Sequence, residues 1–75
     1  MFIIYSKQTG DIKNIATGDN YKEIKDLFPY DYKDYEIIYN TLNVPDDLFV
    51  INNFNMFKIE NNKIVAKQSL LDKYK

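Results

Sequence analysis

The chain has 75 residues, which is enough for one small domain, and a formal net charge of -1. Cysteine and histidine are absent, which excludes disulfides, thiolate metal sites and the commonest general base. In a domain this small, hydrophobic burial barely offsets the conformational entropy lost on folding, so we expect help from a partner or from self-association.

A β-hairpin opens the chain. Residues 2–5 are β-branched or aromatic, and residues 12–17 form a suitable partner strand. Between them lies Gly10, which can adopt the positive φ that a three-residue hairpin turn with a bulge requires. The start of the chain lacks a basic region and a long apolar run, so neither a signal peptide nor a membrane span is expected.

A short helix is expected next, over residues 21–28. Asn20 can cap it, with Glu23 three residues later in the pattern of a capping box. Apolar residues recur at helical spacing, and Pro29 disfavours helical backbone at the residue before it. The helix is therefore about two turns long and needs a sheet to pack on.

The middle of the chain is predicted to be a loop over 30–34 followed by a strand over 35–42. The strand is predicted from its β-branched and aromatic residues, and its period places Tyr35, Ile37 and Tyr39 on one core-facing side. Residues 48–51 follow a turn, and they fit either a short buried strand or a helical turn capped by an aspartate.

A second hairpin is expected at residues 54–60 and 63–68. Asn61 and Asn62 tolerate the positive φ of a two-residue type I′ turn. This turn pairs Ile59 with Ile64 on the core face, together with Phe57 and Ala66. Residues 69–75 fit either a serine-capped helical turn or a frayed tail.

These elements predict a single α+β domain spanning residues 1–75. The order is two strands, one helix, one strand, an ambiguous short element and two strands. We expect an antiparallel sheet with the one short helix packed on one face.

The residue types present exclude most chemistry. The chain offers no nucleophile paired with a histidine, and no enzyme activity, cofactor or catalytic residue is expected. Asp31, Asp34 and Glu36 lack the spacing of a calcium loop, so no metal site is expected. Lysines are dispersed and arginine is missing, so nucleic acid is an improbable partner.

Tyrosines alternate with acidic residues from residue 30 to 39, in the most acidic third of the chain. Tyrosine provides rigid, amphipathic contact area, and binding surfaces favour it. Because loop residues are usually exposed, we expect a partner-binding site at the start of this segment, formed by Tyr30, Asp31, Tyr32 and Asp34. The alternative for Tyr30 and Tyr32 is burial in the core.

Both hairpins carry a resemblance to a known group of sequences. Residues 1–12 and 52–65 resemble small open reading frames in phage and prophage genomes of low-GC Gram-positive bacteria, often beside tail genes. The resemblance implies a minor virion, tail-associated or accessory protein, located in the host cytoplasm or on the virion. It implies no functional residue.

The functional expectation is a non-enzymatic protein–protein interaction module that binds a protein partner and forms a homo-oligomer. The alternative is a small acidic inhibitor that occludes a host defence or regulatory protein with its tyrosine-rich surface.

Overall fold

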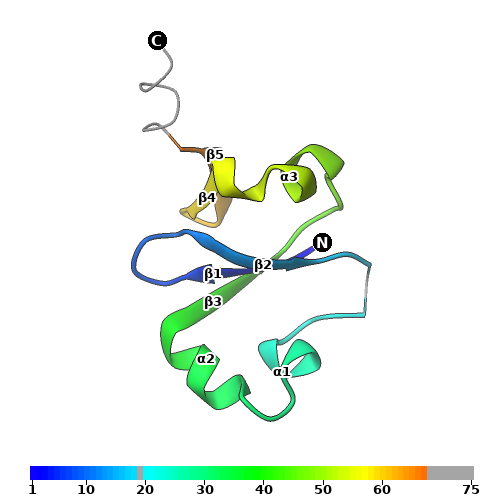
Figure 1. Cartoon of the computed structure of the whole chain (residues 1–75), viewed down its shortest axis with the longest axis vertical. Coiled ribbons are helices and arrows are strands. Elements are labelled where there is room, and N and C mark those ends of the chain that lie inside the picture. The colour runs from blue at the N-terminus through cyan, green and yellow to red at the C-terminus, as the bar shows by residue number, and fades with distance from the viewer. Residues whose placement is uncertain (19, 68–75) are drawn as a thin grey trace.

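The structure is a computed structural model, and it describes residues 1–18 and 20–67. It has three layers (Figure 1). A three-stranded antiparallel sheet lies in the middle, two helices cover one face, and a helix with a two-stranded sheet covers the other. The predicted α+β class with antiparallel pairing is confirmed, although the strands form two sheets and the helices are more numerous than expected.

The central sheet is built on the opening hairpin, which the sequence predicted correctly. Strand β1 (Phe2–Ser6) pairs with β2 (Ile12–Ala16) on one side and with β3 (Tyr39–Asn43) on the other. Gly10 has a φ of 80°, as its place in the turn requires. Because β1 pairs with a strand on each side, it is the middle strand of the sheet, and its side chains are covered on both faces.

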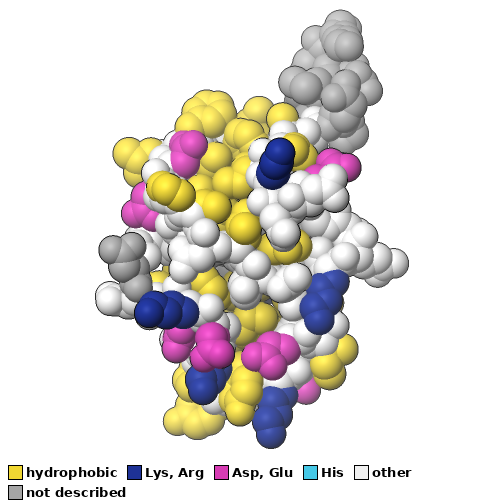
Figure 2. Space-filling view, turned by 180° about the vertical axis from the view of Figure 1, so that it is seen from behind, with side chains coloured by type: hydrophobic (Ala, Val, Ile, Leu, Met, Phe, Trp, Pro, Cys, Tyr) yellow, Lys and Arg dark blue, Asp and Glu magenta, His cyan; other side chains and the backbone are white. Residues whose placement is uncertain are grey.

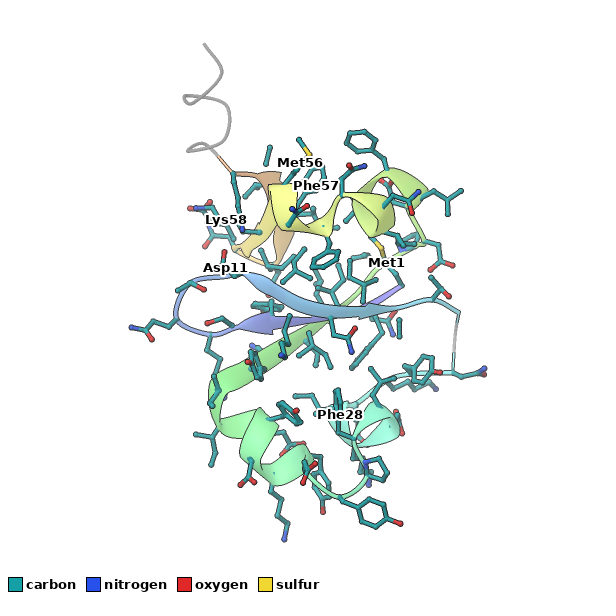
Figure 3. All side chains as sticks on the ribbon, in the orientation of Figure 1. Met1, Asp11, Phe28, Met56, Phe57 and Lys58 are labelled. Carbon is teal, nitrogen blue, oxygen red and sulfur yellow. The ribbon has the colours of Figure 1, made fainter. Side chains whose placement is uncertain are left out.

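Side chains of β1 alternate between two separate hydrophobic clusters, because successive residues of a strand point to opposite faces. Ile3 and Tyr5 belong to the first cluster, which lies between the central sheet and α3 (Leu48–Asn52), β4 (Phe57–Glu60) and β5 (Lys63–Ala66). Phe2 and Ile4 belong to the second cluster, which lies between the central sheet and α1 (Ile24–Leu27) and α2 (Tyr32–Ile38). Figure 3 shows the side chains of both layers meeting the sheet, with Phe28 in the second cluster.

Helix α1 is shorter than predicted and begins later. The backbone amides of Lys22 and Glu23 both donate to the Asp26 carboxylate at 2.9 Å, so Asp26 rather than Asn20 organises the start of the helix. The Tyr21 carbonyl accepts a hydrogen bond from the Asn43 side chain at 3.1 Å. This contact ties Tyr21 to β3, which keeps it outside the helix.

The loop predicted over 30–34 and the strand predicted over 35–42 are both wrong in part, because residues 32–38 form the helix α2. The predicted strand is present only from residue 39 onward, as β3. The ladder between β1 and β3 ends at a bond from the Lys7 amide to the Ile38 carbonyl. Beyond Ser6, β1 enters its turn, so a longer β3 would have no partner strand. A helix satisfies its own backbone groups, and here it also places Tyr32 and Tyr35 on the second cluster.

The prediction that Tyr35, Ile37 and Tyr39 share one core-facing side is wrong for Ile37, because residues 32–38 are helical. Tyr35 and Tyr39 pack in the second cluster, with the Tyr35 ring 4.5 Å from the ring of Phe28 and 5.7 Å from that of Tyr39. Ile37 is instead 75% exposed. Tyr35 lies three residues after Tyr32 on the helix face that meets the second cluster, whereas Ile37 lies on another side of the helix. Tyr39 reaches the same cluster as the first residue of β3.

The ambiguous segment at 48–51 is helical. The Asp47 carboxylate accepts hydrogen bonds from the amides of Phe49 at 3.0 Å and Val50 at 3.3 Å, which is an N-cap. A 3₁₀ turn, η1 (Phe54–Met56), connects α3 to β4.

The second hairpin has the predicted register, with Ile59 opposite Ile64 and Phe57 opposite Ala66. Asn61 and Asn62 both have positive φ, at 53° and 61°. Ile59, Ile64 and Phe57 contact the first cluster, whereas Ala66 is exposed. Residues 69–75, for which a helical turn or a frayed tail was predicted, lie outside the described residues.

Candidate functional site

Large apolar side chains that remain exposed form two sets, one in each outer layer. Seven such residues occur in the described part of the chain. One set, here called the α3 surface, consists of Leu48, Phe49, Phe54 and Met56. The other, here called the α2 surface, consists of Tyr30, Ile37 and Ile38. Because the central sheet separates the two layers, the two surfaces lie at opposite ends of the molecule (Figure 1).

The α3 surface is the larger of the two. Leu48 is 74% exposed and Phe49 63%, while Phe54 and Met56 are exposed by about two fifths. Figure 2 shows hydrophobic side chains gathered over this end of the molecule. All four residues lie within nine positions of the chain, on α3 and η1, in the same outer layer of the fold.

The α3 surface rests on a well-anchored support. The same helix turns Val50 and Ile51 into the first cluster, and the Phe49 ring meets the ring of Phe57 edge-on at 5.9 Å. The Asn53 side-chain amide donates to the Phe49 carbonyl at 2.9 Å. Together with the Asp47 cap, these contacts hold the exposed side chains on a fixed backbone.

Three ion pairs involve residues of the segment 46–67. Asp46 pairs with the α-amino group of Met1, Lys58 with Glu60 at 3.8 Å, and Lys67 with Asp11 at 3.3 Å. The hydrogen bond from Lys67 lowers the pKa of the Asp11 carboxyl. The Met1 amino group likewise lowers the pKa of Asp46.

The predicted partner-binding residues, Tyr30, Asp31, Tyr32 and Asp34, lie together at the start of α2 but differ in exposure. Tyr30 is 94% exposed. Asp31 is the N-cap residue and Asp34 lies in the first turn, both exposed. The Tyr32 ring packs on the second cluster, so it belongs largely to the core. Of the two tyrosines for which exposure or burial was open, Tyr30 is exposed and Tyr32 is partly buried.

The far end of α2 is fixed to the central hairpin. The Lys7 ammonium donates to the Glu36 carbonyl at 2.7 Å, and the Lys7 amide donates to the Ile38 carbonyl at 3.0 Å. A cation at this place also interacts favourably with the helix dipole. Ile37 and Ile38 therefore project from an anchored helix end.

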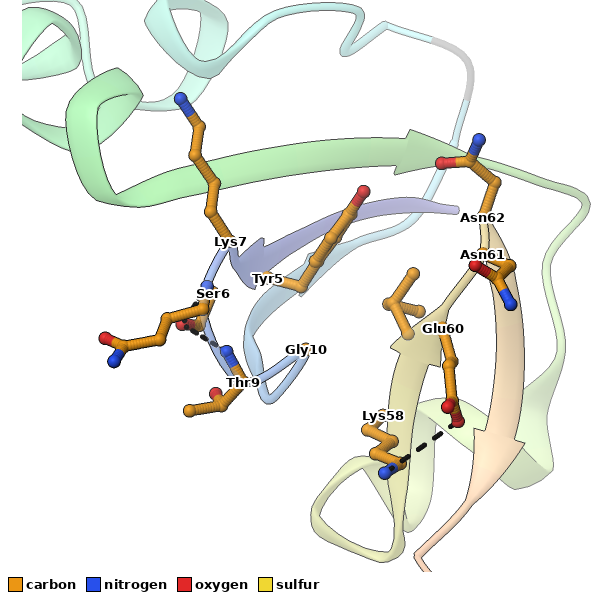
Figure 4. A pocket seen from close by; sticks show the side chains of 11 residues that line it. Tyr5, Ser6, Lys7, Thr9, Gly10, Lys58, Glu60, Asn61 and Asn62 are labelled. Carbon is orange, nitrogen blue, oxygen red and sulfur yellow. Dashed lines mark hydrogen bonds and ion pairs between the residues drawn. The ribbon is translucent and has the colours of Figure 1, made fainter.

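A hollow of about 380 Å³ lies between the two hairpin turns (Figure 4). Its lining comes from residues 5–10 of the first turn and 58–62 of the second. Ser6 accepts hydrogen bonds from the amides of Gln8 and Thr9, and Lys58 pairs with Glu60 along β4. These groups are engaged with one another, and the hollow serves as the open seam between the two sheets.

Gly10 closes the floor of that seam. Its carbonyl accepts a hydrogen bond from the Ile59 amide at 2.8 Å. The backbones of Asp11 and Lys58 form an isolated antiparallel β-bridge. A Cβ at position 10 would lie 2.3 Å from the Ile59 carbonyl oxygen. The absence of a side chain therefore permits the two sheets to join.

Among residues 1–18 and 20–67, no group of three or more acidic side chains is arranged to hold a metal ion. In the same residues no helix is long and apolar enough to cross a membrane.

The chain matches no family model, and it is similar to no curated protein and no solved structure in the comparisons made.

Sequence reasoning did not identify the α3 surface. A signal for it was present: residues 48–51 are four consecutive large apolar residues directly after Asp47, a residue type favoured as a helix cap. Four consecutive residues of a helix point in all directions around its axis, so a surface helix cannot bury all of them. The undecided choice between strand and helix concealed this consequence.

Proposed function

We propose that this chain is a non-enzymatic protein-interaction module with two binding surfaces at opposite ends. The observation that carries the proposal is the division of its exposed large apolar residues into two sets, held apart by a sheet that is covered on both faces. Each set lies on or beside a helix that packs against the core, α3 with η1 for one set and α2 for the other. A module of this form can link one protein to another.

The size of the α3 surface supports this proposal. Large side chains each present on the order of 200 Å² when fully exposed, so the four together expose about 400 Å² of mainly apolar area. The largest apolar patch on a typical monomer covers about 300–600 Å² and is often functional. Exposing this much apolar area is unfavourable in water, and covering it with another protein removes that cost.

A second candidate function is that of an acidic inhibitor that occludes a host protein through the α2 surface. The specific observation in its favour is Tyr30, almost fully exposed and followed by the exposed carboxylates of Asp31 and Asp34. Tyrosine is a common hot-spot residue at interfaces, and nearby carboxylates raise the rate of association with a basic partner.

The biological setting that we propose is a phage or prophage, with the chain as a minor virion, tail-associated or accessory protein in the host cell or on the particle. The support is the resemblance of both hairpins to small phage reading frames. Adjacent tail genes would favour a virion component. A neighbourhood of small unrelated reading frames would favour the inhibitor.

The test is affinity capture with cross-linking in the native host, followed by quantitative binding of each purified partner. Phe49→Ser perturbs the α3 surface and Ile37→Ser the α2 surface, and each is the control for the other. We expect at least one partner whose affinity falls about tenfold or more with one variant only. A partner that is lost equally with both variants, or none that responds to either, would contradict the proposal.

A further inference from the structure

We propose that the outer edge of β2 is a docking site for an extended peptide segment of another protein, which adds a fourth strand to the central sheet. The site is made of backbone groups, so it belongs to neither the α3 surface nor the α2 surface. The sheet has the order β2-β1-β3, which leaves β2 and β3 as its two edges. In the described residues, these edges differ in whether their outward backbone groups are engaged.

Strand pairing determines which residues of the two edges point outward. The Lys7 amide donates to the Ile38 carbonyl, so the odd-numbered residues of β1 bond to β3. The backbone groups of successive strand residues point to opposite sides, and the even-numbered residues of β1 therefore bond to β2. These residues lie opposite Asn14 and Ala16, which consequently face β1, whereas Ile15 faces outward.

The outward groups of β3 are engaged within the chain. The Tyr39 amide donates to the Tyr35 carbonyl, as the C-cap of α2. The Thr41 amide donates to the side-chain oxygen of Asn40 at 2.9 Å. A strand that docked here would have to break these bonds first, so this edge is closed to further pairing.

The edge of β2 has no such closure. The N–H and C=O groups of Ile15, and of Thr17 directly after the strand, form no hydrogen bond within residues 1–18 and 20–67. Thr17 is exposed and Ile15 is only partly buried. In Figure 1, β2 crosses in front of β3, so this edge faces the viewer. Unpaired edge groups of this kind are a template for pairing with another chain.

The length of the open edge favours a peptide as the occupant. At one end β4 takes up the edge, because the Gly10 carbonyl accepts the Ile59 amide. At the other end the chain turns at Gly18, with a φ of 91°. A short peptide with free ends fits between these limits. A second copy that paired antiparallel through its own β2 would bring its β4 and its turn to the two ends of the same short run.

The neighbouring side chains indicate which peptides fit. Ile15 packs on the first cluster and Ala16 on the second, and both are partly buried. A strand beside β2 places alternate side chains over the two layers. We therefore expect main-chain hydrogen bonds to supply the affinity and apolar residues beside Ile15 and Ala16 to supply the preference among peptides.

The first test is amide hydrogen exchange of the full chain without any peptide, followed residue by residue by NMR. Because only outward amides lack a partner, Ile15 should exchange at least about tenfold faster than Asn14 and Ala16. An Ile15 amide that is as protected as its neighbours would overturn the proposal. Protection that increases with protein concentration would also overturn it, because the occupant would then be a second copy.

The second test uses a defined probe, a capped seven-residue peptide of alternating valine and threonine. Its addition should shift the NMR signal of the Ile15 amide and slow its exchange. The same peptide with alternate amides N-methylated cannot pair and should not bind. Thr17→Pro removes one outward N–H and should weaken binding at least about fivefold. Thr17→Ala keeps that N–H and is the matched control, with binding unchanged. Circular dichroism verifies that both variants are folded.

Three results of this second test would overturn the docking site. They are an Ile15 amide that does not respond to the peptide at millimolar concentration, equal binding of the N-methylated peptide, and equal affinities of Thr17→Pro and Thr17→Ala. The proposed function is tested separately, because Phe49→Ser and Ile37→Ser leave the β2 edge intact and should not change peptide binding.

Discussion

Gly10→Ala is the substitution whose effect can be derived most fully from the structure. Gly10 has a φ of 80°, and its carbonyl accepts the Ile59 amide at 2.8 Å. An added Cβ would lie 2.3 Å from the Ile59 carbonyl oxygen, which is too close for two atoms that do not bond. The contact is with backbone, so it cannot be relieved by rotating a side chain. The two sheets must separate at this point.

The expected loss of stability has two parts. Left-handed backbone costs a residue with a Cβ about 1–2 kcal/mol. Separating the sheets weakens the hydrogen bond between Gly10 and Ile59, which contributes about 1 kcal/mol, and loosens the packing of Ile59 beneath it. We expect a total of at least about 3 kcal/mol, a large part of the roughly 4–11 kcal/mol that a domain of 75 residues possesses.

Gly18→Ala is the matched control. Gly18 also has positive φ, at 91°, but a Cβ there would meet nothing within 4 Å. This variant should therefore lose only the backbone part, about 1–2 kcal/mol. The assay is urea unfolding followed by far-UV circular dichroism at constant pH. If Gly10→Ala were no more destabilising than Gly18→Ala, the argument that a close approach of two backbones joins the sheets would be refuted.

Three further predictions concern stability. Asp47→Ala should lower the free energy of unfolding by about 1 kcal/mol through loss of the α3 cap, whereas Asp47→Ser should retain most of it in urea titrations; equal losses would count against the cap. Because Lys67 lowers the pKa of Asp11, the stability that this pair provides is present above pH 3.8 and is lost as the pH falls below it. Asp11→Asn should therefore reduce the dependence of the urea midpoint on pH in this acid range, and an unchanged slope would show that the pair is not formed. Tyr30→Ala should alter the unfolding free energy by less than about 0.5 kcal/mol, while Tyr32→Ala should cost about 1–3 kcal/mol because its ring packs in the core; similar losses would contradict their assigned environments.

Both hairpins were predictable because each is specified by a few adjacent residues. Gly10 allows the first turn its positive φ, and Asn61 with Asn62 allows the second turn its two positive values. Once the second turn is set, every cross-strand pair follows, including Ile59 with Ile64. Interactions of this kind lie within the segment itself, so the sequence contains the information.

Helix α2 could not be predicted from its own residues. Residues 35–42 contain β-branched and aromatic residues typical of a strand, and β3 uses the second half of that run. The change from helix to strand falls at Tyr39, because the neighbouring strand β1 ends at Ser6 and leaves residues 32–38 without a partner. The β propensity of residues 35–38 is overridden because β1, more than thirty residues earlier in the chain, is too short to pair with them.

The candidate site divides in the same way. Composition alone excluded histidine and cysteine chemistry. The sequence left open whether Tyr30 is exposed or in the core, and the structure shows it 94% exposed. The partial burial of Tyr32 and the exposure of Leu48 and Phe49 depend on which face of a short helix meets the sheet. The local sequence determines that a turn, a cap or a strand can form, whereas only the packing of distant elements decides which apolar side chains are covered and which remain in water.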